Sequence, residues 1–276
     1  MTKVKADLHN HLRTSGRIYD TDFNTAIDIA AKRLGEGAVF GVVNFDDKRY
    51  ERFTEFRGYE RVYVGENCNG FYVPEKKVLV VKGQEVPTKE GHLLVIGLGK
   101  NAHLTQHRTL AETLKEAEDN QGVTIVDHPF HSHGLGSYLE SNPEPLMRID
   151  AIEVYNGEAA FGIPGTPFPY GANKRAQTFY DRIKSYSPHL GALASSDGHS
   201  MYELGRSWTE IDEPDLVEKT KFADSLKESV RNTDSQTPKR KKNSVFGAID
   251  HLVDLAFIVK VAPRIGLGKL FETDRP

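Results

Sequence analysis

The chain has 276 residues, 38% of them hydrophobic, and a formal net charge of -3. Its length suits one α/β barrel with a short appendage, and its small net charge gives no sign of a polyanion-binding surface or an acidic tail. Cys68 is the single cysteine, so an intrachain disulfide and a thiolate metal cage are both excluded. Any metal must therefore be held by nitrogen and oxygen ligands.

The first residues lack the apolar stretch of a secretory signal. No apolar run reaches the roughly 18 residues that a membrane span requires. We therefore expect a cytoplasmic protein that makes no membrane contact.

Short apolar runs bounded by Gly, Pro, Asp or Asn recur along the chain and have the length of strands. We expect strands at residues 4–8, 38–43, 78–81, 93–98, 123–126, 151–155 and 190–194.

Stretches with helical spacing lie between these runs. One helix has Phe23, Ile27 and Leu34 on a single face and would be capped by Thr21 or Asp22. Another begins at the capping-box pattern of Thr109 and Glu112, and a third is expected over residues 171–186. Strands that alternate with helices favour parallel pairing, because a parallel connection needs a crossover long enough to hold a helix. The expected fold is an α/β barrel.

The last part of the chain has a different character. Residues 212–234 are expected to form one charged amphipathic helix, followed by an exposed basic loop at 235–242. Residues 244–260 are too apolar for a fully solvated helix, so this segment should pack on the barrel or on a second subunit in a homo-oligomer. We accordingly divide the chain into a barrel domain, 1–234, and a C-terminal helical appendage, 235–276.

Histidines and carboxylates gather at the ends of the expected strands. His9 and His11 directly follow the first strand, and their spacing in an extended chain places both side chains on one face. Strand ends of this kind face the active site in a parallel barrel. The other candidates at strand ends are Glu85, His92, His128, Asp197 and His199. Imidazole nitrogens and carboxylate oxygens suit zinc, iron or manganese, and a carboxylate can bridge two such ions.

Six ordered motifs between residues 7 and 199 resemble those of the polymerase and histidinol phosphatase (PHP) family. They are Asp7-Leu8-His9-Asn10-His11, Gly83-Gln84-Glu85, Gly91-His92-Leu93-Leu94, Asp127-His128-Pro129, Ile152-Glu153-Val154-Tyr155-Asn156-Gly157 and Ser196-Asp197-Gly198-His199. The resemblance implies a distorted seven-stranded β/α (TIM-like) barrel with a centre of two or three metals that hydrolyses phosphoesters.

The resemblance also implies which residues hold the metals. One metal would be bound by His9, His11, Glu85 and Asp197, and a second by bridging Glu85 with His92 and His128. His199 would belong to a third site, whose remaining ligands are histidines near Arg17 and Phe45 in trinuclear members.

This chain departs from the pattern at the third site, because Phe45 cannot bind a metal. A loop shift that brings in Asp46 or Asp47 stays open. We expect two divalent ions, with a third as the alternative, and we expect His199 to act as a weaker ligand or as a proton carrier.

Further charged residues lie beside the motifs. Arg13, Arg17 and Arg206 are candidates to bind the phosphate, and a guanidinium at Arg17 would replace part of the missing third charge. His131 is a candidate to orient the substrate or to protonate the leaving group. The same residues could instead be ordinary surface side chains. Glu153 and Asn156 could support the ligands or make purely structural hydrogen bonds.

The leading functional hypothesis is a metal-dependent phosphatase or phosphodiesterase that uses a metal-activated water on a small phosphorylated metabolite or nucleotide. Nucleic acid is expected only as a nucleotide or a short oligonucleotide. Two alternatives remain, a metal-dependent amide or C–N hydrolase and a noncatalytic domain that binds metal for stability. The sequence leaves open the substrate, the preference for monoester or diester, and the identity of the metal.

Overall fold

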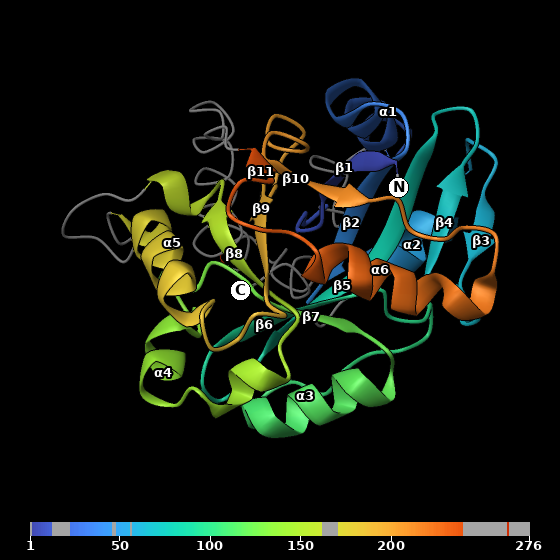
Figure 1. Cartoon of the computed structure of the whole chain (residues 1–276). Coiled ribbons are helices and arrows are strands. Elements are labelled where there is room, and N and C mark those ends of the chain that lie inside the picture. Colours follow the sequence, from blue (N-terminus) through green and yellow to red (C-terminus); the bar gives the residue numbers. More distant parts are fainter. Residues whose placement is uncertain are drawn as a thin grey trace.

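The computed structural model describes residues 2–12, 23–45, 48–55, 57–161, 171–239 and 264. Strands and helices alternate around one barrel-shaped sheet (Figure 1). The strands are β1 (Lys3–Asp7), β2 (Ala38–Asn44), β3 (Val62–Val64), β4 (Gly70–Val73), β5 (Val78–Pro87), β6 (His92–Ile96), β7 (Val123–Val126), β8 (Ala151–Asn156), β9 (Gly191–Ser195), β10 (Trp208–Asp212) and β11 (Pro238–Lys239). The α-helices are α1 (Phe23–Leu34), α2 (Arg49–Glu55), α3 (Leu110–Asp119), α4 (Gly136–Ser141), α5 (Ala172–Ile183) and α6 (Phe222–Arg231), and the short 3-10 helices are η1 (Glu144–Met147), η2 (Ala159–Phe161) and η3 (Lys219–Lys221).

The expected TIM-like α/β barrel is confirmed. The strands follow the order β11-β10-β1-β2-β5-β6-β7-β8-β9, and β4 pairs with β5 and with β3 beside this path. The seven strands expected from the sequence correspond to β1, β2 and β5 to β9. The sheet has 11 strands among the described residues, because the β3–β4 hairpin and the strands β10 and β11 are added to those seven.

The strand directions differ from the expectation of parallel pairing. The ladders β1–β2–β5 and β7–β8–β9 are parallel, whereas β6 is antiparallel to both of its neighbours and β10 is antiparallel to β1. A tight turn joins β5 to β6, in which Thr88 N donates to Gly91 O at 2.9 Å. This turn is too short for a crossover helix, so β6 must reverse. As a result, β6 begins at the end of the barrel where β5 finishes.

The barrel is closed between β9 and β10 by a side chain. Ala194 N donates to Thr209 Oγ1 at 2.7 Å, and Thr209 Oγ1 lies 3.3 Å from Ala194 O. Among the described residues no ladder joins these two strands. The Thr209 hydroxyl therefore stands in for the backbone hydrogen bonds that join the other neighbouring strands.

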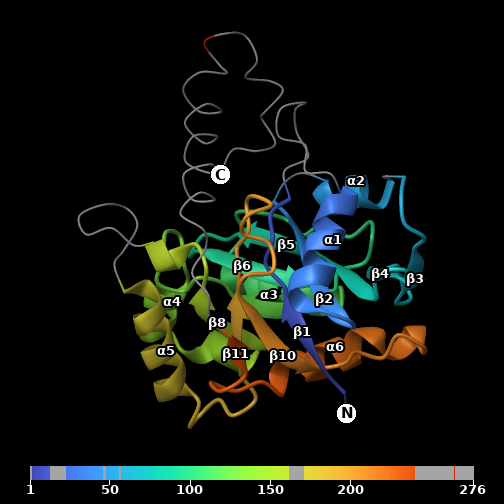
Figure 2. The same ribbon diagram turned by 90° about the horizontal axis from the view of Figure 1, so that it is seen from above.

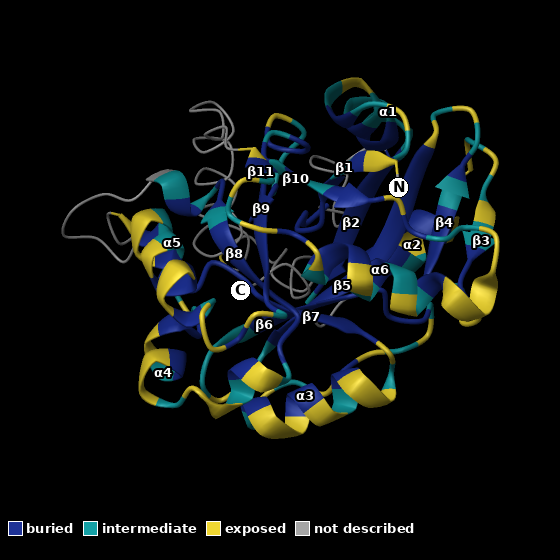
Figure 3. Ribbon diagram, in the orientation of Figure 1, coloured by how far each residue is buried: buried dark blue, intermediate teal, exposed yellow. Residues whose placement is uncertain are grey.

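The hydrophobic core has three parts. Alternate side chains of the strands fill the barrel interior, where Phe222, Leu226 and Val230 of α6 join them. On the outer face, α1 and α2 cover the sheet around β2 and β5, while α3, α4 and α5 cover it around β6 to β8. Figure 3 shows the outer helices with one buried and one exposed face. This layering leaves one end of the barrel for α6 and the other for polar residues.

Helix α6 lies on the side of the barrel where the chain begins (Figure 2). The expectation of one helix over 212–234 is wrong, because Asp212 ends β10 and α6 begins only at Phe222. Pro214 follows the strand, and the Asp215 carboxylate then accepts hydrogen bonds from the backbone of Val217 and Glu218 at 2.9 and 3.0 Å. These bonds hold a turn that delays the helix.

Other local expectations are confirmed. The capping box of Thr109 and Glu112 is present at the start of α3. The helix expected over 171–186 is α5, which ends at Ile183. The expected caps Thr21 and Asp22 lie outside the described residues.

The proposed appendage, 235–276, lies outside the described residues apart from 235–239 and 264. β11 extends the barrel sheet beyond the expected boundary at residue 234, since Pro238 pairs with Thr209. The domain division and the homo-oligomer through the helix at 244–260 stay predictions. Within the described part of the chain, no helix combines the length and the apolar character needed to cross a bilayer.

Candidate metal centre

One mouth of the barrel collects the polar side chains that the sequence singled out. The parallel strands end there, and β6 begins there because it runs in the opposite direction. The structure brings together His9, His11, Glu85, His92, His128, Asp197 and His199 at this mouth. His11 N also donates to Gly198 O at 2.8 Å, which ties the first motif directly to the last one.

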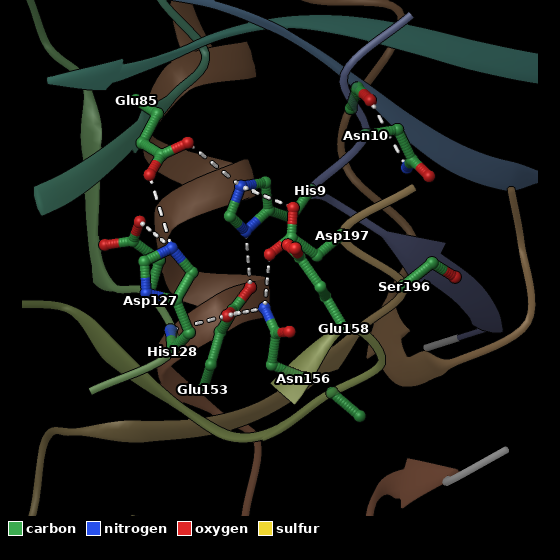
Figure 4. A network of polar contacts seen from close by, with 12 residues as sticks. His9, Asn10, Glu85, Asp127, His128, Glu153, Asn156, Glu158, Ser196 and Asp197 are labelled. Atoms are coloured by element: carbon green, nitrogen blue, oxygen red, sulfur yellow. Dashed lines mark hydrogen bonds and ion pairs between the residues drawn. The ribbon is translucent and has the colours of Figure 1, made fainter. Parts of the chain in front are cut away.

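Glu85 lies at the centre of this group. Its Oε2 is 2.9 Å from His11 Nε2 and 3.6 Å from His9 Nε2. Its Oε1 is 3.2 Å from His128 Nε2 and also contacts His92 Nδ1. The two oxygens of one carboxylate thus face two different pairs of histidines, and Figure 4 shows Glu85 between His9 and His128. Glu85 was expected to follow its strand, but β5 continues to Pro87.

The charge of Glu85 is stabilised by its neighbours. Glu85 is 2% exposed. Burial alone would raise the pKa of Glu85, but hydrogen bonds with His11, His128, His9 and His92 hold it well below its usual value. Glu85 is therefore an anion in the middle of a cluster of imidazoles.

Asp197 completes the group on the side of His9 and His11. Its Oδ1 is 3.5 Å from His9 Nε2 and 3.7 Å from His11 Nε2, and the two imidazole nitrogens are 3.0 Å apart. Nitrogen and oxygen atoms that converge in this way can bind a divalent cation. Three sets of ligand atoms close enough to share a cation occur among the described residues, and they are His9, His11 and Glu85; Glu85, His92, Asp127 and His128; and His11, Asp197 and His199.

Glu153 and Asn156, at the end of β8, orient the candidate ligands. His9 Nδ1 donates to Glu153 Oε1 at 3.0 Å, which leaves His9 Nε2 as the nitrogen that faces Glu85 and Asp197. Glu153 Oε2 accepts from His128 N and from Asn156 Nδ2 at 2.8 and 2.9 Å. Asn156 Nδ2 also donates to Asp197 Oδ2 at 3.0 Å, so the other oxygen of Asp197 faces the histidines.

His11 stacks with two other rings. The centroid of its ring is 4.4 Å from that of Phe45 and 4.7 Å from that of His199, with interplanar angles of 10° and 12°. Burial, together with the nearby His199 and His9, lowers the pKa of His11 to about 3 despite its contact with Glu85. His11 is therefore neutral, which is the form that binds a metal. Phe45 offers no donor atom beside it.

The two histidines predicted to take part in catalysis also lie at this mouth. His199 Nε2 is 3.3 Å from Asp197 Oδ1 and 3.4 Å from Glu158 Oε2. Burial lowers the pKa of His199, but the hydrogen bonds with Asp197 and Glu158 outweigh it and raise the value to about 9. The His131 ring is 6.0 Å from that of His128, and burial lowers the pKa of His131.

Of the three arginines predicted to bind phosphate, the structure describes only Arg206. Arg13 and Arg17 lie outside the described residues, as do Asp46 and Asp47. Arg206 lies in the loop after the last motif, where its backbone N donates to Ser196 Oγ at 2.8 Å and its guanidinium to Tyr202 O at 3.5 Å. Its role toward a substrate stays a prediction.

Three acidic residues of the site have no role predicted from the sequence, namely Asp7 and Asp127, which stand in the quoted motifs, and Glu158, which does not. Asp7 accepts hydrogen bonds from Ser196 N and Gly205 N, both at 2.9 Å, and so ties β1 to the loop that carries Asp197. Asp127 directly precedes His128 at a strand end, and this adjacency was the available signal. The contact of Glu158 with His199 had no signal in the sequence.

Two site residues have an unusual backbone conformation. His128 and Asp197 have positive φ angles of 24° and 50°. Such angles are unfavourable for residues other than glycine and persist where the surrounding contacts impose them. Both residues supply a candidate ligand at a strand end.

Comparison with known proteins gives a match in sequence and several in structure. A family model described as PHP-associated matches residues 171–230. No curated protein matches the sequence significantly.

The solved structures that resemble this chain share its fold at low sequence identity. PsfC from Pseudomonas syringae PB-5123 is 16% identical with a TM-score of 0.55, and the match covers 86% of this chain and 94% of PsfC. The lesion-specific endonuclease PfuEndoQ from Pyrococcus furiosus is 17% identical with a TM-score of 0.52, over 86% of this chain and 57% of the endonuclease. A complex of endonuclease Q with a 27-mer duplex that carries an abasic lesion is 15% identical with a TM-score of 0.53, over 86% and 58% of the two chains. This chain thus spans a little over half the length of the endonucleases.

Proposed function

We propose that this chain is a metal-dependent phosphoester hydrolase of the kind that its motifs resemble, a proposal supported by the match of residues 171–230 to the PHP-associated family model. The observation that carries the proposal is the position of Glu85. Its two oxygens face separate pairs of histidines, an arrangement that would suit a carboxylate shared between two cations.

The donor atoms fit divalent cations. His9, His11, Glu85 and Asp197 would hold the first cation, and Glu85, His92 and His128 the second. Glu85 and Asp197 are each 2% exposed, and buried carboxylates of this kind are retained where cations or hydrogen-bond donors compensate their charge. Zinc, manganese and iron all accept such ligands. We propose two ions rather than three, because Phe45 offers no donor beside His11.

Bound divalent cations supply a water of lowered pKa and offset the charge on the phosphoester oxygens. The chain itself fixes the ligands, since Glu153 holds His9 and Asn156 holds Asp197. His199 is placed between Asp197 and Glu158, and its raised pKa keeps a proton on the ring at neutral pH. We assign it the transfer of that proton to the leaving oxygen, with His131 orienting the substrate.

The substrate proposed is a small phosphorylated metabolite or a nucleotide. Arg13, Arg17 and Arg206 are proposed to bind its phosphate, because a guanidinium matches phosphate oxygens in charge and geometry. The structural likeness to a lesion-specific endonuclease and to its complex with an abasic duplex makes a short oligonucleotide the natural second substrate to assay.

The test combines elemental analysis of the purified protein with a panel of substrates. Metal-stripped protein would be reloaded with zinc, manganese or iron and assayed on an aryl phosphate, an aryl phosphodiester, a nucleotide and an abasic oligonucleotide. We expect metal-dependent release of phosphate or cleavage of the diester. His9→Ala, Asp197→Ala and Glu85→Gln should each lower turnover by roughly a thousandfold or more, which corresponds to about 4 kcal/mol.

Glu140→Gln is the matched control for Glu85→Gln, because Glu140 forms ion pairs with Arg175 and Arg182 on the helical exterior. It should leave turnover unchanged, and circular dichroism should show the fold intact in all variants. Hydrolysis of cyclic amides without any phosphate preference would establish a C–N hydrolase instead. Full activity of folded Glu85→Gln protein would overturn the binuclear site.

A further inference from the structure

We infer that Asp127 is an additional ligand of the second cation position, beside Glu85, His92 and His128. The inference rests on the metal centre of the proposed function but not on phosphoester hydrolysis. It gives the second position two histidines and two carboxylates, where the motifs alone assign it two histidines and the shared Glu85.

The first argument is that Asp127 is fully buried and that no donor in the described part of the chain forms a hydrogen bond with either of its oxygens. Its side chain is 0% exposed, and neither carboxylate oxygen has a hydrogen bond among the described residues. An ionised carboxylate in that environment is costly unless a cation or donor lies against it.

Other buried aspartates of this chain do have donors. Asp7 accepts from two backbone amides, and Asp150 accepts from Thr124 N at 2.8 Å and from Arg231 Nε at 2.7 Å. Asp127, which has no such donor within the described ranges, lies beside the imidazoles of His92 and His128. The fold thus leaves both Asp127 oxygens available at a place where cations are expected.

The second argument is the direction of the contact. Asp127 Oδ2 is 3.2 Å from His128 Nε2, the same nitrogen that lies 3.2 Å from Glu85 Oε1. Figure 4 shows Asp127 and Glu85 both directed at that edge of the His128 ring. Two carboxylates thus converge on one ring nitrogen, and a cation placed between them could bind all three atoms.

A carboxylate that only orients a ligating histidine contacts the ring nitrogen that points away from the cation. Glu153 does this for His9, through Nδ1. Asp127 contacts the nitrogen of His128 that faces the cluster, so its geometry is that of a ligand. Donor atoms of Asp127, Glu85, His92 and His128 all lie within 4.8 Å of one another.

The consequence is that the two cation positions become alike. The first offers two imidazoles with Glu85 and Asp197, and the second would offer two imidazoles with Glu85 and Asp127. We therefore expect both ions to be retained over a similar range of chelator concentration, rather than the second being lost early.

The test compares wild-type protein with Asp127→Asn, which preserves the shape of the side chain and removes its charge. Manganese or zinc alone is titrated into metal-free protein by calorimetry, and retained metal is counted by elemental analysis after dialysis. Wild type should keep two equivalents. Asp127→Asn should keep one, with the second bound at least about tenfold to hundredfold more weakly.

Thermal unfolding of the metal-free proteins gives an independent readout. Without metal, Asp127→Asn should be more stable than wild type, because a buried carboxylate that lacks a hydrogen-bond donor among the residues described has been replaced by a neutral amide. Asp150→Asn is the matched control. Asp150 is equally buried but already has donors, so this variant should lose stability and still bind two cations.

Two equivalents bound to Asp127→Asn with wild-type affinity, or a metal-free variant less stable than wild type, would overturn the assignment of Asp127 alone. Wild-type protein that binds no cation would overturn the proposed function as well. Because these measurements use no phosphoester, the two failures can be told apart.

Discussion

The stacked pair His11 and His199 shows how neighbours set the role of a single side chain. The two rings are 4.7 Å apart, yet the pKa of His11 falls to about 3 and that of His199 rises to about 9. Burial lowers both values. His199 differs because Asp197 and Glu158 both accept from its Nε2, and so one ring is suited to bind a metal and the other to carry a proton.

His199→Gln is therefore expected to act through the leaving group. Turnover of an alkyl phosphate, whose leaving oxygen needs a proton, should fall by about 10²–10⁴-fold. Turnover of a nitrophenyl phosphate should fall much less, because that leaving group departs as the anion. Steady-state rates on the two substrates provide the measurement.

His189→Gln is a suitable control for that experiment, since His189 lies outside the site and contacts the carbonyls of Leu146 and Ile149. It should change neither rate. An equal loss on both phosphates in His199→Gln would contradict proton transfer and favour a role for His199 as a metal ligand.

At the level of strands, the site depends on the close approach of β1 and β2. Gly41 lies against the end of β1, and a Cβ at this position would come within 2.1 Å of Leu8 O. His9 follows Leu8 directly. The position of the first ligand is thus tied to the absence of a side chain on the neighbouring strand.

Gly41→Ala is expected to destabilise the protein by about 1–3 kcal/mol, as overpacking does elsewhere, and to weaken metal binding at the same time. Denaturant unfolding and metal titration would measure the two effects. Thr109→Ala, which removes the cap of α3, should cost about 1 kcal/mol and leave metal binding unchanged. Wild-type metal affinity in Gly41→Ala would show that β1 can shift without moving His9.

The positions of the strands could be predicted from the sequence better than the directions in which they run. The seven apolar runs expected as strands are all strands, because a buried strand needs an apolar run whichever way it points. The reversal of β6 is encoded only by the short turn at 88–91. β10 is not predicted by the sequence, because Trp208 to Asp212 contains only two apolar residues, which are separated by two polar ones.

The site residues, like the strands, were predictable from the sequence only in part. The motifs named the residues that converge around Glu85, and the structure brings them to one mouth. The sequence assigns Asp127 no role, because an aspartate at a strand end usually caps a helix or is solvated, and only the structure shows that Asp127 is completely buried. The ring of Phe45 against His11 likewise required coordinates.

The two ends of the barrel have different roles, one in packing and the other in carrying the candidate ligands. Helix α6 packs on the interior residues at one end, where Val230 O lies beside Gly191 at the start of β9. The candidate ligands lie between residues 9 and 199 at the other end. All of the candidate ligands predicted from the sequence precede β11 in the chain.

A chain that ends at residue 239 is therefore expected to fold and to bind the same number of cations as the full chain. Thermal unfolding and elemental analysis of the two proteins would measure this. If the shortened chain fails to fold, residues 240–276 are part of the barrel domain rather than an appendage, and the division proposed from the sequence is wrong.

The closure at Thr209 has a mechanical consequence. Every other junction along the path of described strands is a ladder of backbone bonds, but β9 and β10 are joined by side chains: the Thr209 hydroxyl and, directly after β9, the Ser196 hydroxyl, which accepts from Arg206 N and Ser207 N. Strands β9 and β10 should therefore separate transiently more often than any other pair of neighbouring strands among the described residues. Asp197 follows β9, whereas Glu85 belongs to β5. Separation of β9 from β10 would therefore increase the distance between two ligands of the first cation, and it would provide a route by which ions enter and leave.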